Sequence, residues 1–183
     1  MTANIELYES TNNGGVTRGS LFSTFTSGVH QEAFNNLQAF WANATGVNAY
    51  PYAGKSTVNR GSDAGETNAP APLGVRDLQL HPPSNNHETI AAFRVPQNGT
   101  YVISNIGVRR VSSSGNNARL RVFNAQGTQL TNLNATNNRQ WVTTSTAYTM
   151  SNLTAGQYIY FGVDRNGNYG YDATEVSWTI TKN

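Results

Sequence analysis

The residues from position 164 to position 175 have the types and the spacing that could bind a metal ion. Oxygen-bearing side chains occupy positions 1, 3, 5, 9 and 12 of this segment, and they belong to Asp164, Asn166, Asn168, Asp172 and Glu175. This is the ligand spacing of an EF-hand calcium loop, in which several oxygens surround a hard cation. However, Tyr169 occupies the sixth position, where that loop needs glycine, and Asn, Gly and Asp are also common in β-hairpin turns. A structural calcium ion and a plain turn are both compatible with the segment, and no other cofactor is expected.

A second group of residues could bind a sugar. Tyr158 and Tyr160 alternate with apolar residues, and Arg119 and Arg121 do so in another segment, so each pair occupies the outer side of an expected strand. Tyrosine rings can stack on the apolar face of a sugar ring, and arginine can bind carboxylate or sulfate through two parallel hydrogen bonds. If the two strands share a sheet, the four side chains form a glycan-binding face. Tyr and Arg are also ordinary residues of half-exposed strands, and that reading stays open.

Other aromatic and charged residues give weaker signals. Trp41, Trp141 and Tyr169 are further candidates for stacking on a sugar, whereas Trp178 alternates with apolar residues and is expected in the core. The arginines at 109, 110, 119 and 121 could form a nucleic-acid patch, but a net charge of +2 is too small for a typical phosphate-binding domain. Neither the ten carboxylates nor the three histidines match a catalytic or metal-binding motif, so the protein is not expected to be an enzyme.

The composition favours an all-β domain with many turns. The 183 residues include 24 Asn and 21 Thr, and only 12% of the chain is charged. Thr and the aromatic residues favour strands, whereas Asn and Gly favour turns. The absence of cysteine excludes disulfides and thiolate metal sites. No apolar run approaches the roughly 20 residues that span a bilayer, and no signal peptide is expected in the first 30 residues.

These residues must be positioned by strands. From Leu73 onward, about eight short segments alternate or carry apolar runs, and turn residues separate them. The segments are 73–80, 89–95, 100–110, 119–122, a short one after Gly127, 139–150, 157–163 and 174–181. Short strands at such regular spacing predict an antiparallel β-sandwich or barrel.

The first 72 residues have a different pattern. Apolar residues between Val29 and Trp41 have the spacing of one helical face, so a short helix is expected there. Residues 43–72 are rich in Gly, Asn, Ala, Pro and Ser, and they predict a long loop or linker. Residues 1–72 are therefore expected to be a partly helical extension used for docking or oligomerisation, and residues 73–183 the sandwich.

Four motifs in the second part of the chain occur together in one order. They are Leu80-His81-Pro82, the pattern Phe93-x-x-Pro96-x-x-Gly99-x-Tyr101, the segment from Leu153 to Val163 around Ala155-Gly156, and Tyr171-Asp172-Ala173-Thr174 followed by Trp178-Thr179-Ile180. Over residues 80–181 the chain resembles a family of bacterial carbohydrate-binding-module-like jelly-roll sandwiches. Pro83 and Asp164 depart from this family's Gly, and Gln157 departs from its Asp. The resemblance implies a jelly-roll fold in which Asp172 ties its loop down, with or without a metal.

Two functions fit these observations. The first is a non-catalytic, lectin-like module that binds a polysaccharide or a cell-surface glycan. The second is a structural or assembly protein of a phage or other extracellular particle, such as a tail, fibre or capsid-decoration component, which could also bind a receptor. Both place the protein outside the cell or in a virion, with neither nucleic acid nor membrane as partner. The second also requires a symmetric oligomer.

Overall fold

The structure, a computed structural model, describes a β protein. It gives the side chains of residues 78–82, 87–110, 114–136, 140–168 and 170–183, and the backbone of five strands between residues 5 and 56. The described part of the chain contains no helix, and hence none that could cross a membrane.

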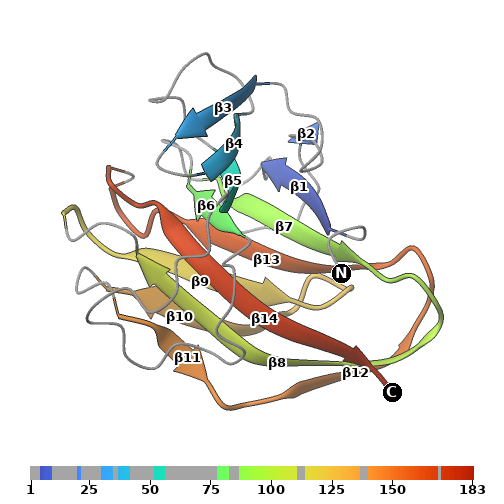
Figure 1. Cartoon of the computed structure of the whole chain (residues 1–183). Helices are drawn as coiled ribbons and strands as arrows, with labels where there is room; N and C mark the ends of the chain where they lie inside the picture. Colours follow the sequence, from blue (N-terminus) through green and yellow to red (C-terminus); the bar gives the residue numbers. More distant parts are fainter. Residues whose placement is uncertain are drawn as a thin grey trace.

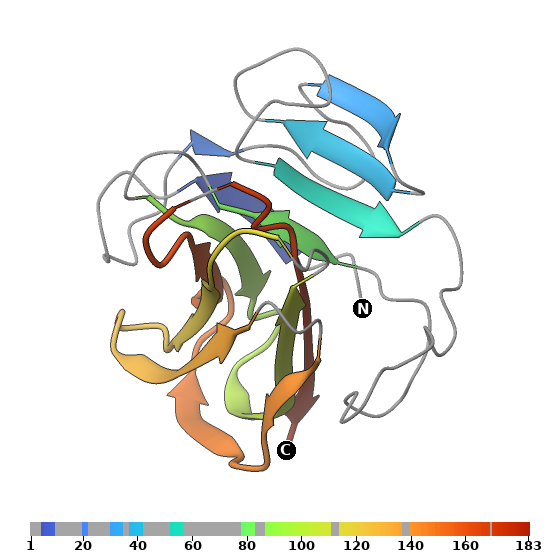
Figure 2. The ribbon, with the colours of Figure 1, turned by 90° about the vertical axis from the view of Figure 1, so that its left-hand side faces the viewer.

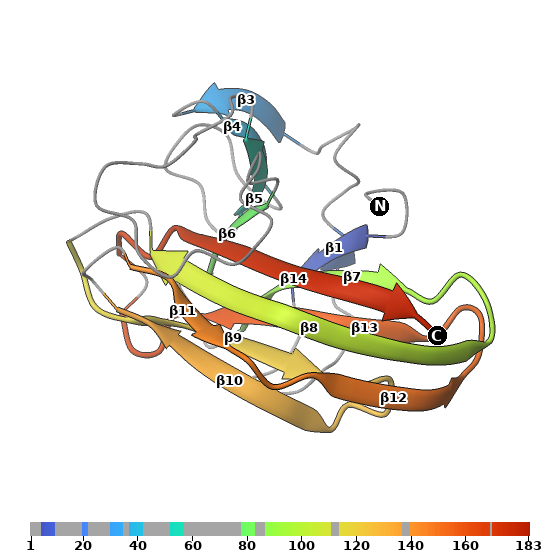
Figure 3. The same ribbon diagram turned by 60° about the horizontal axis from the view of Figure 1, so that its bottom comes forward.

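Nine strands with described side chains form an antiparallel sandwich (Figure 1). They are β6 (Gln79–His81), β7 (Thr89–Arg94), β8 (Gly99–Arg110), β9 (Ala118–Phe123), β10 (Gln129–Ala135), β11 (Val142–Thr144), β12 (Tyr148–Leu153), β13 (Tyr158–Asp164) and β14 (Thr174–Lys182). Sheet I has the order β10-β9-β13-β7, and sheet II has the order β11-β8-β14-β6 with β12 also paired to β8. From β6 to β9 each successive strand lies in the other sheet, as in a jelly roll. Figure 3 shows the two layers, with β8 and β14 in front of β9 and β13.

Five strands from the first part of the chain extend both sheets. They are β1 (Ile5–Glu9), β2 (Ser20–Leu21), β3 (His30–Phe34), β4 (Leu37–Trp41) and β5 (Tyr52–Ser56). β1 pairs with β7 and continues sheet I to β2, while β5 pairs with β6 and continues sheet II to β4 and β3 (Figure 2). β5 thus lies within the segment expected to be a loop. The boundary between residues 72 and 73 stays a prediction.

The helix predicted from Val29 to Trp41 is wrong over the strands described there. β3 and β4 pair as antiparallel neighbours, with His30 opposite Trp41 and Phe34 opposite Leu37. The two residues between these strands in the sequence are both asparagine, which favours turns over helix interiors. The apolar spacing fitted one helical face across both segments, but pairing with β5 satisfies the backbone of β4 as a strand instead.

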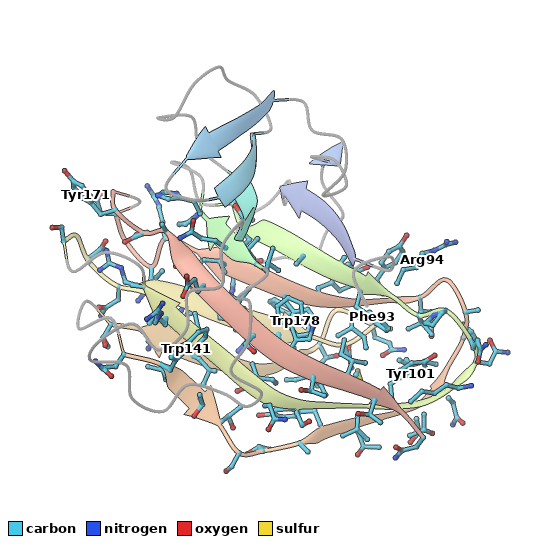
Figure 4. The ribbon with its side chains drawn as sticks, in the orientation of Figure 1. Phe93, Arg94, Tyr101, Trp141, Tyr171 and Trp178 are labelled. Carbon is cyan, nitrogen blue, oxygen red and sulfur yellow. The ribbon has the colours of Figure 1, made fainter. Side chains whose placement is uncertain are left out.

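The core lies between the two sheets and comes from alternate residues of their strands. Its fully buried members include Leu80, Ala91, Ile103, Ile106, Val108, Leu120, Val122, Ile159, Phe161 and Val163. Trp178 packs against this core as expected, with its ring 3.7 Å from that of Phe161, centroid to centroid, and inclined by 7°. Figure 4 shows Trp178 between the sheets. Strict alternation in β9 and β13 therefore sends their remaining side chains to the outer face of sheet I.

The loop between β7 and β8 explains one of the sequence motifs. The hydroxyl of Tyr101 donates a 2.7 Å hydrogen bond to the carbonyl of Gln97, and its ring lies 6.1 Å from that of Phe93. The amide of Val95 donates to the carbonyl of Gln157, and the amide of Gly156 donates to the carbonyl of Val95. The motif residues thus fix two neighbouring turns at one end of the sandwich.

Candidate functional site

The outer face of sheet I brings together the two tyrosines and two arginines selected from the sequence. β13 and β9 are antiparallel neighbours, with Tyr160 opposite Phe123 and Asp164 opposite Arg119. Because residues directly opposite each other point to the same side of a sheet, Tyr158, Tyr160, Arg119 and Arg121 share this face. We call it the tyrosine face.

The two tyrosines form a pair at one end of this face. Their ring centroids are 6.0 Å apart and the rings are inclined by 26°, so they are close to parallel. Both rings are half-buried and pack on Ile90 and Ala92 of β7. Two near-parallel rings that pack against apolar side chains are restrained in position, which suits stacking on a sugar ring.

The two arginines are engaged with carboxylates at the other end of the face. Arg121 donates from Nε to Oε1 of Glu88 at 2.6 Å and lies 3.2 Å from Oδ2 of Asp164. Arg119 donates to the same Asp164 oxygen from Nε at 3.0 Å and from Nη2 at 2.8 Å. Burial raises the pKa of Glu88 to about 6, against the opposing effect of Arg121. These contacts make the arginines part of an internal ion-pair row. Fewer of their N–H groups therefore remain to bind a ligand's acid group.

Two asparagines border this ion-pair row. Asn132 lies opposite Arg121 and Asn134 lies opposite Arg119 on β10, and both side chains are exposed. Their amides can donate and accept hydrogen bonds, which is the chemistry that sugar hydroxyls need. The neighbouring strands thus add polar groups beside the tyrosines.

Sequence reasoning missed Arg94 and Phe123. Arg94 lies directly opposite Tyr158 at the end of β7, and its side chain is exposed. Phe123 lies opposite Tyr160 on β9, and the guanidinium carbon of Arg121 is 5.6 Å from its ring centroid. Both residues lie on the outward-facing side of their strands, as alternation along the sequence predicts. Only the strand register shows that they flank the tyrosine pair.

The predicted calcium loop has its three carboxylates bound by arginines. Asp164 binds Arg119 and Arg121, Glu175 binds Nε of Arg109 at 2.9 Å, and Oδ1 of Asp172 lies 3.1 Å from Nη2 of Arg110. Among the described residues no group of three or more His, Asp or Glu side chains is placed to hold a metal. A calcium ion would compete with a guanidinium at each carboxylate. Calcium binding stays a prediction, tested by the melting temperature with and without calcium.

Asp172 is paired with a buried arginine that contacts its loop. Its partner Arg110 is fully buried and also donates to the carbonyls of Ser114 and Tyr171. Burial raises the pKa of Asp172 to about 7, while the charge of Arg110 opposes this rise. This arginine therefore connects the β8–β9 loop to the β13–β14 loop.

The remaining aromatic candidates lie elsewhere or outside the described residues. Trp141 precedes β11 of sheet II, is 4% exposed, and has the guanidinium of Arg109 5.6 Å from its ring centroid. Figure 4 shows Trp141 well away from Arg94, which adjoins the tyrosine pair. The side chains of Trp41 and Tyr169 are outside the described residues. The structure thus does not bring Trp141 to the tyrosine face.

The chain has only weak similarity to solved structures. No protein-family model matches the chain, and no curated protein matches it. Among solved structures, the chain is similar to the C-terminal CBM6 of LamC, a marine laminarinase from Zobellia galactanivorans, with 22% identity, 62% of this chain and 85% of that chain covered, and a TM-score of 0.33. A Paenibacillus sp. cycloisomaltooligosaccharide glucanotransferase has 15% identity over 68% of this chain and 16% of that chain, with a TM-score of 0.32. The enzymatically active domain of tailspike protein 4 of bacteriophage CBA120 has 8% identity over 99% of this chain and 20% of that chain, with a TM-score of 0.31.

The fold and the motifs agree on a class of protein. The four motifs in residues 80–181 resemble those of carbohydrate-binding-module-like modules, and the described strands form the two-sheet antiparallel sandwich that this resemblance implies. The described part of the chain is therefore an antiparallel β-sandwich.

Proposed function

We propose that this protein is a non-catalytic glycan-binding module that holds a polysaccharide on its tyrosine face. The observation that carries the proposal is the near-parallel pair of Tyr158 and Tyr160 on an apolar base, with the exposed Arg94 directly opposite Tyr158. Half-buried rings lose little conformational freedom on binding, since their packing already restricts them.

The polar groups around the pair suit the rest of a sugar. Asn132 and Asn134 border the face with exposed amides, and the ion pairs of Arg119 and Arg121 hold the intervening surface in one arrangement. Stacking would supply affinity and the amides would supply orientation. A partner of this chemistry is a polysaccharide or a cell-surface glycan outside the cell.

Alanine substitution of the two tyrosines tests the proposal. A glycan array first identifies a ligand, and isothermal titration calorimetry then compares wild type with Tyr158→Ala and Tyr160→Ala. We expect each variant to lose about tenfold in affinity, or about 1.4 kcal/mol, because a stacked ring is removed. Tyr158→Phe and Tyr160→Phe keep the ring and should bind within about threefold of wild type.

Tyr171→Ala is the matched control, since Tyr171 is 67% exposed and lies in the loop at the opposite end of the sandwich. This control should bind like wild type. Unchanged binding by both tyrosine-face alanine variants, with melting temperatures near that of wild type, would show that sugars do not stack on this face.

A further inference from the structure

The described charged side chains are divided between the two ends of the sandwich. One end holds four carboxylates and the four arginines that bind them: Glu88, Asp164, Asp172 and Glu175 with Arg109, Arg110, Arg119 and Arg121. The opposite end holds Arg94 at the end of β7 and Lys182 at the end of β14. Figure 4 shows Arg94 on the far side of the molecule from Tyr171. At the first end each described carboxylate is thus paired with an arginine, and the opposite end carries cations with no described carboxylate beside them.

A small open pocket lies beside Arg94. It has a volume of about 200 Å³ and is lined by Arg94, Val95, Pro96, Ala155 and Gly156. Its walls are the turn after β7 and the turn before β13, and its lining residue Arg94 lies directly opposite Tyr158, the first residue of β13. The pocket therefore adjoins the tyrosine face.

Hydrogen bonds between the two turns hold this pocket in shape. The amide of Gly156 donates to the carbonyl of Val95 at 2.8 Å, and the amide of Ala155 donates to Oδ1 of Asn98 at 2.8 Å. Gly156 has a φ of +90°, a conformation that glycine adopts without strain. A wall of bonded backbone is preformed, so binding there would not have to order it.

Arg94 differs from the arginines at the other end in its partners. No carboxylate among the described residues lies within ion-pair distance of its guanidinium, whereas Arg109, Arg110, Arg119 and Arg121 each have one. An exposed guanidinium at a preformed pocket can bind a planar carboxylate through two parallel hydrogen bonds, or a sulfate through two of its oxygens.

We infer that this pocket binds the acidic group of an anionic sugar whose ring stacks on Tyr158. The inference rests on the proposed function, and it restricts the ligand to glycans with a carboxylate or sulfate on the ring nearest the pocket. Arg94 binds the acid group and Tyr158 binds the ring, because these residues lie directly opposite each other on the same face. Arg119 and Arg121 are already bound to carboxylates of the protein, so the ligand's acid group is assigned to Arg94.

NMR titration of the full chain with three monosaccharides tests the inference. Glucose, glucuronate and glucose 6-sulfate share a ring and differ in their acid group. We expect glucuronate or glucose 6-sulfate to shift the Nε–Hε resonance of Arg94 and the ring resonances of Tyr158, and to bind about tenfold more tightly than glucose at an ionic strength of about 0.15 M. A response to only one of the two acids identifies the acid group.

Two controls separate a specific site from general attraction of anions. Arg165 follows the other end of β13, far from the pocket. Its Nε–Hε resonance should therefore not shift when the Arg94 resonance shifts. The variant Arg94→Gln should bind all three sugars with the affinity that wild type has for glucose, and Arg94→Lys should recover only part of the preference because it lacks the guanidinium fork.

The outcomes distinguish the two proposals. Equal shifts at Arg94 and Arg165, or no preference for either acid, overturn the anionic pocket. If Tyr158 then still responds to glucose, the glycan-binding face stands without the pocket. If neither Tyr158 nor Arg94 responds to any of the sugars, the pocket is wrong, and the array with the tyrosine variants decides the face separately.

Discussion

Gly162 leaves room on the tyrosine face for the Glu88 carboxylate of the ion-pair row. A Cβ atom at this position would lie 2.9 Å from Cδ of Glu88 and 3.0 Å from both of its carboxylate oxygens. Glu88 is fully buried over this glycine and bonds to Arg121. The missing side chain therefore provides the space for the carboxylate.

Gly162→Ala tests this close approach. The added methyl group must displace the Glu88 carboxylate from Arg121, so we expect the variant to lose about 1–3 kcal/mol of unfolding free energy in urea denaturation. In the Glu88→Ala background the same substitution should cost at least about 1 kcal/mol less, because no carboxylate remains to be displaced. Equal costs in the two backgrounds would contradict this account.

His81 links folding to pH. It is buried, and its Nδ1 lies 2.8 Å from the carbonyl oxygen of Pro82. Burial lowers the pKa of His81 to about 4, with a further lowering from the charge of Arg110 and a partial opposing effect of the Pro82 carbonyl. Between pH 6.5 and pH 4 the unfolded chain thus binds a proton at this residue and the folded chain does not. The stability that neutral His81 contributes is present above pH 6.5 and is lost as the pH falls toward 4.

His81→Gln tests this linkage. The unfolding free energy of wild type should fall by about 3 kcal/mol relative to the variant between pH 7 and pH 4, from a pKa difference of about 2.5 units. The raised pKa values of Glu88 and Asp172 act with the opposite sign, so the comparison with a variant that keeps both groups removes their effect. Parallel pH profiles for the two proteins would contradict the assignment.

At the scale of elements, a buried ion pair joins the loops at one end of the sandwich. Arg110 ends β8, and it reaches Asp172 just before β14 as well as carbonyls in the β8–β9 and β13–β14 loops. Asp172 in turn accepts a 2.7 Å hydrogen bond from Thr174 at its backbone carbonyl. Three segments of the chain therefore depend on one guanidinium.

Asp172→Ala tests how much the loops depend on this pair. It leaves a fully buried arginine without its counter-charge, so we expect a loss of about 3–5 kcal/mol in denaturation at pH 8, where Asp172 is ionised. The double variant Arg110→Met with Asp172→Ala should recover much of this loss, because no unpaired buried charge remains. If the double variant lost as much unfolding free energy as the two single variants together, the two residues would contribute to stability independently.

At the scale of the whole molecule, the two candidate functions differ in assembly. β1 and β5 pair with strands of sheets I and II, so backbone from the first 56 residues belongs to both layers of this sandwich. A glycan-binding module can act as one chain. A particle component needs a symmetric oligomer.

Light scattering of the purified chain distinguishes these assemblies. We expect a monomer with a mass near 19.8 kDa, since the proposed glycan binding needs only one copy of the tyrosine face. A stable trimer or larger ring, unchanged on dilution, would instead favour the alternative of a particle component with sugar binding as a secondary property.

From residue 89 onward, the sequence by itself determined most of the strands, the turns between them and the side of each strand that faces the core. These follow from alternation and from turn residues, which act over a few positions, so β7 to β10 and β13 to β14 lie close to their expected segments. The segment expected as one strand from 139 to 150 is instead β11 and the start of β12, with three residues between them. Apolar spacing alone also mistook β3 and β4 for a helix, because short apolar runs fit either period.

Only the tertiary structure decided which polar residues meet. Arg121 and Glu88 are 33 positions apart, and Arg109 and Glu175 are 66 apart, so no local pattern links them. Strand register places Arg119 and Arg121 against carboxylates and leaves Arg94 beside Tyr158 and a pocket. Alternation tells which side of a strand a residue occupies. Its neighbours on that side are fixed by hydrogen bonds between strands that are distant in the sequence.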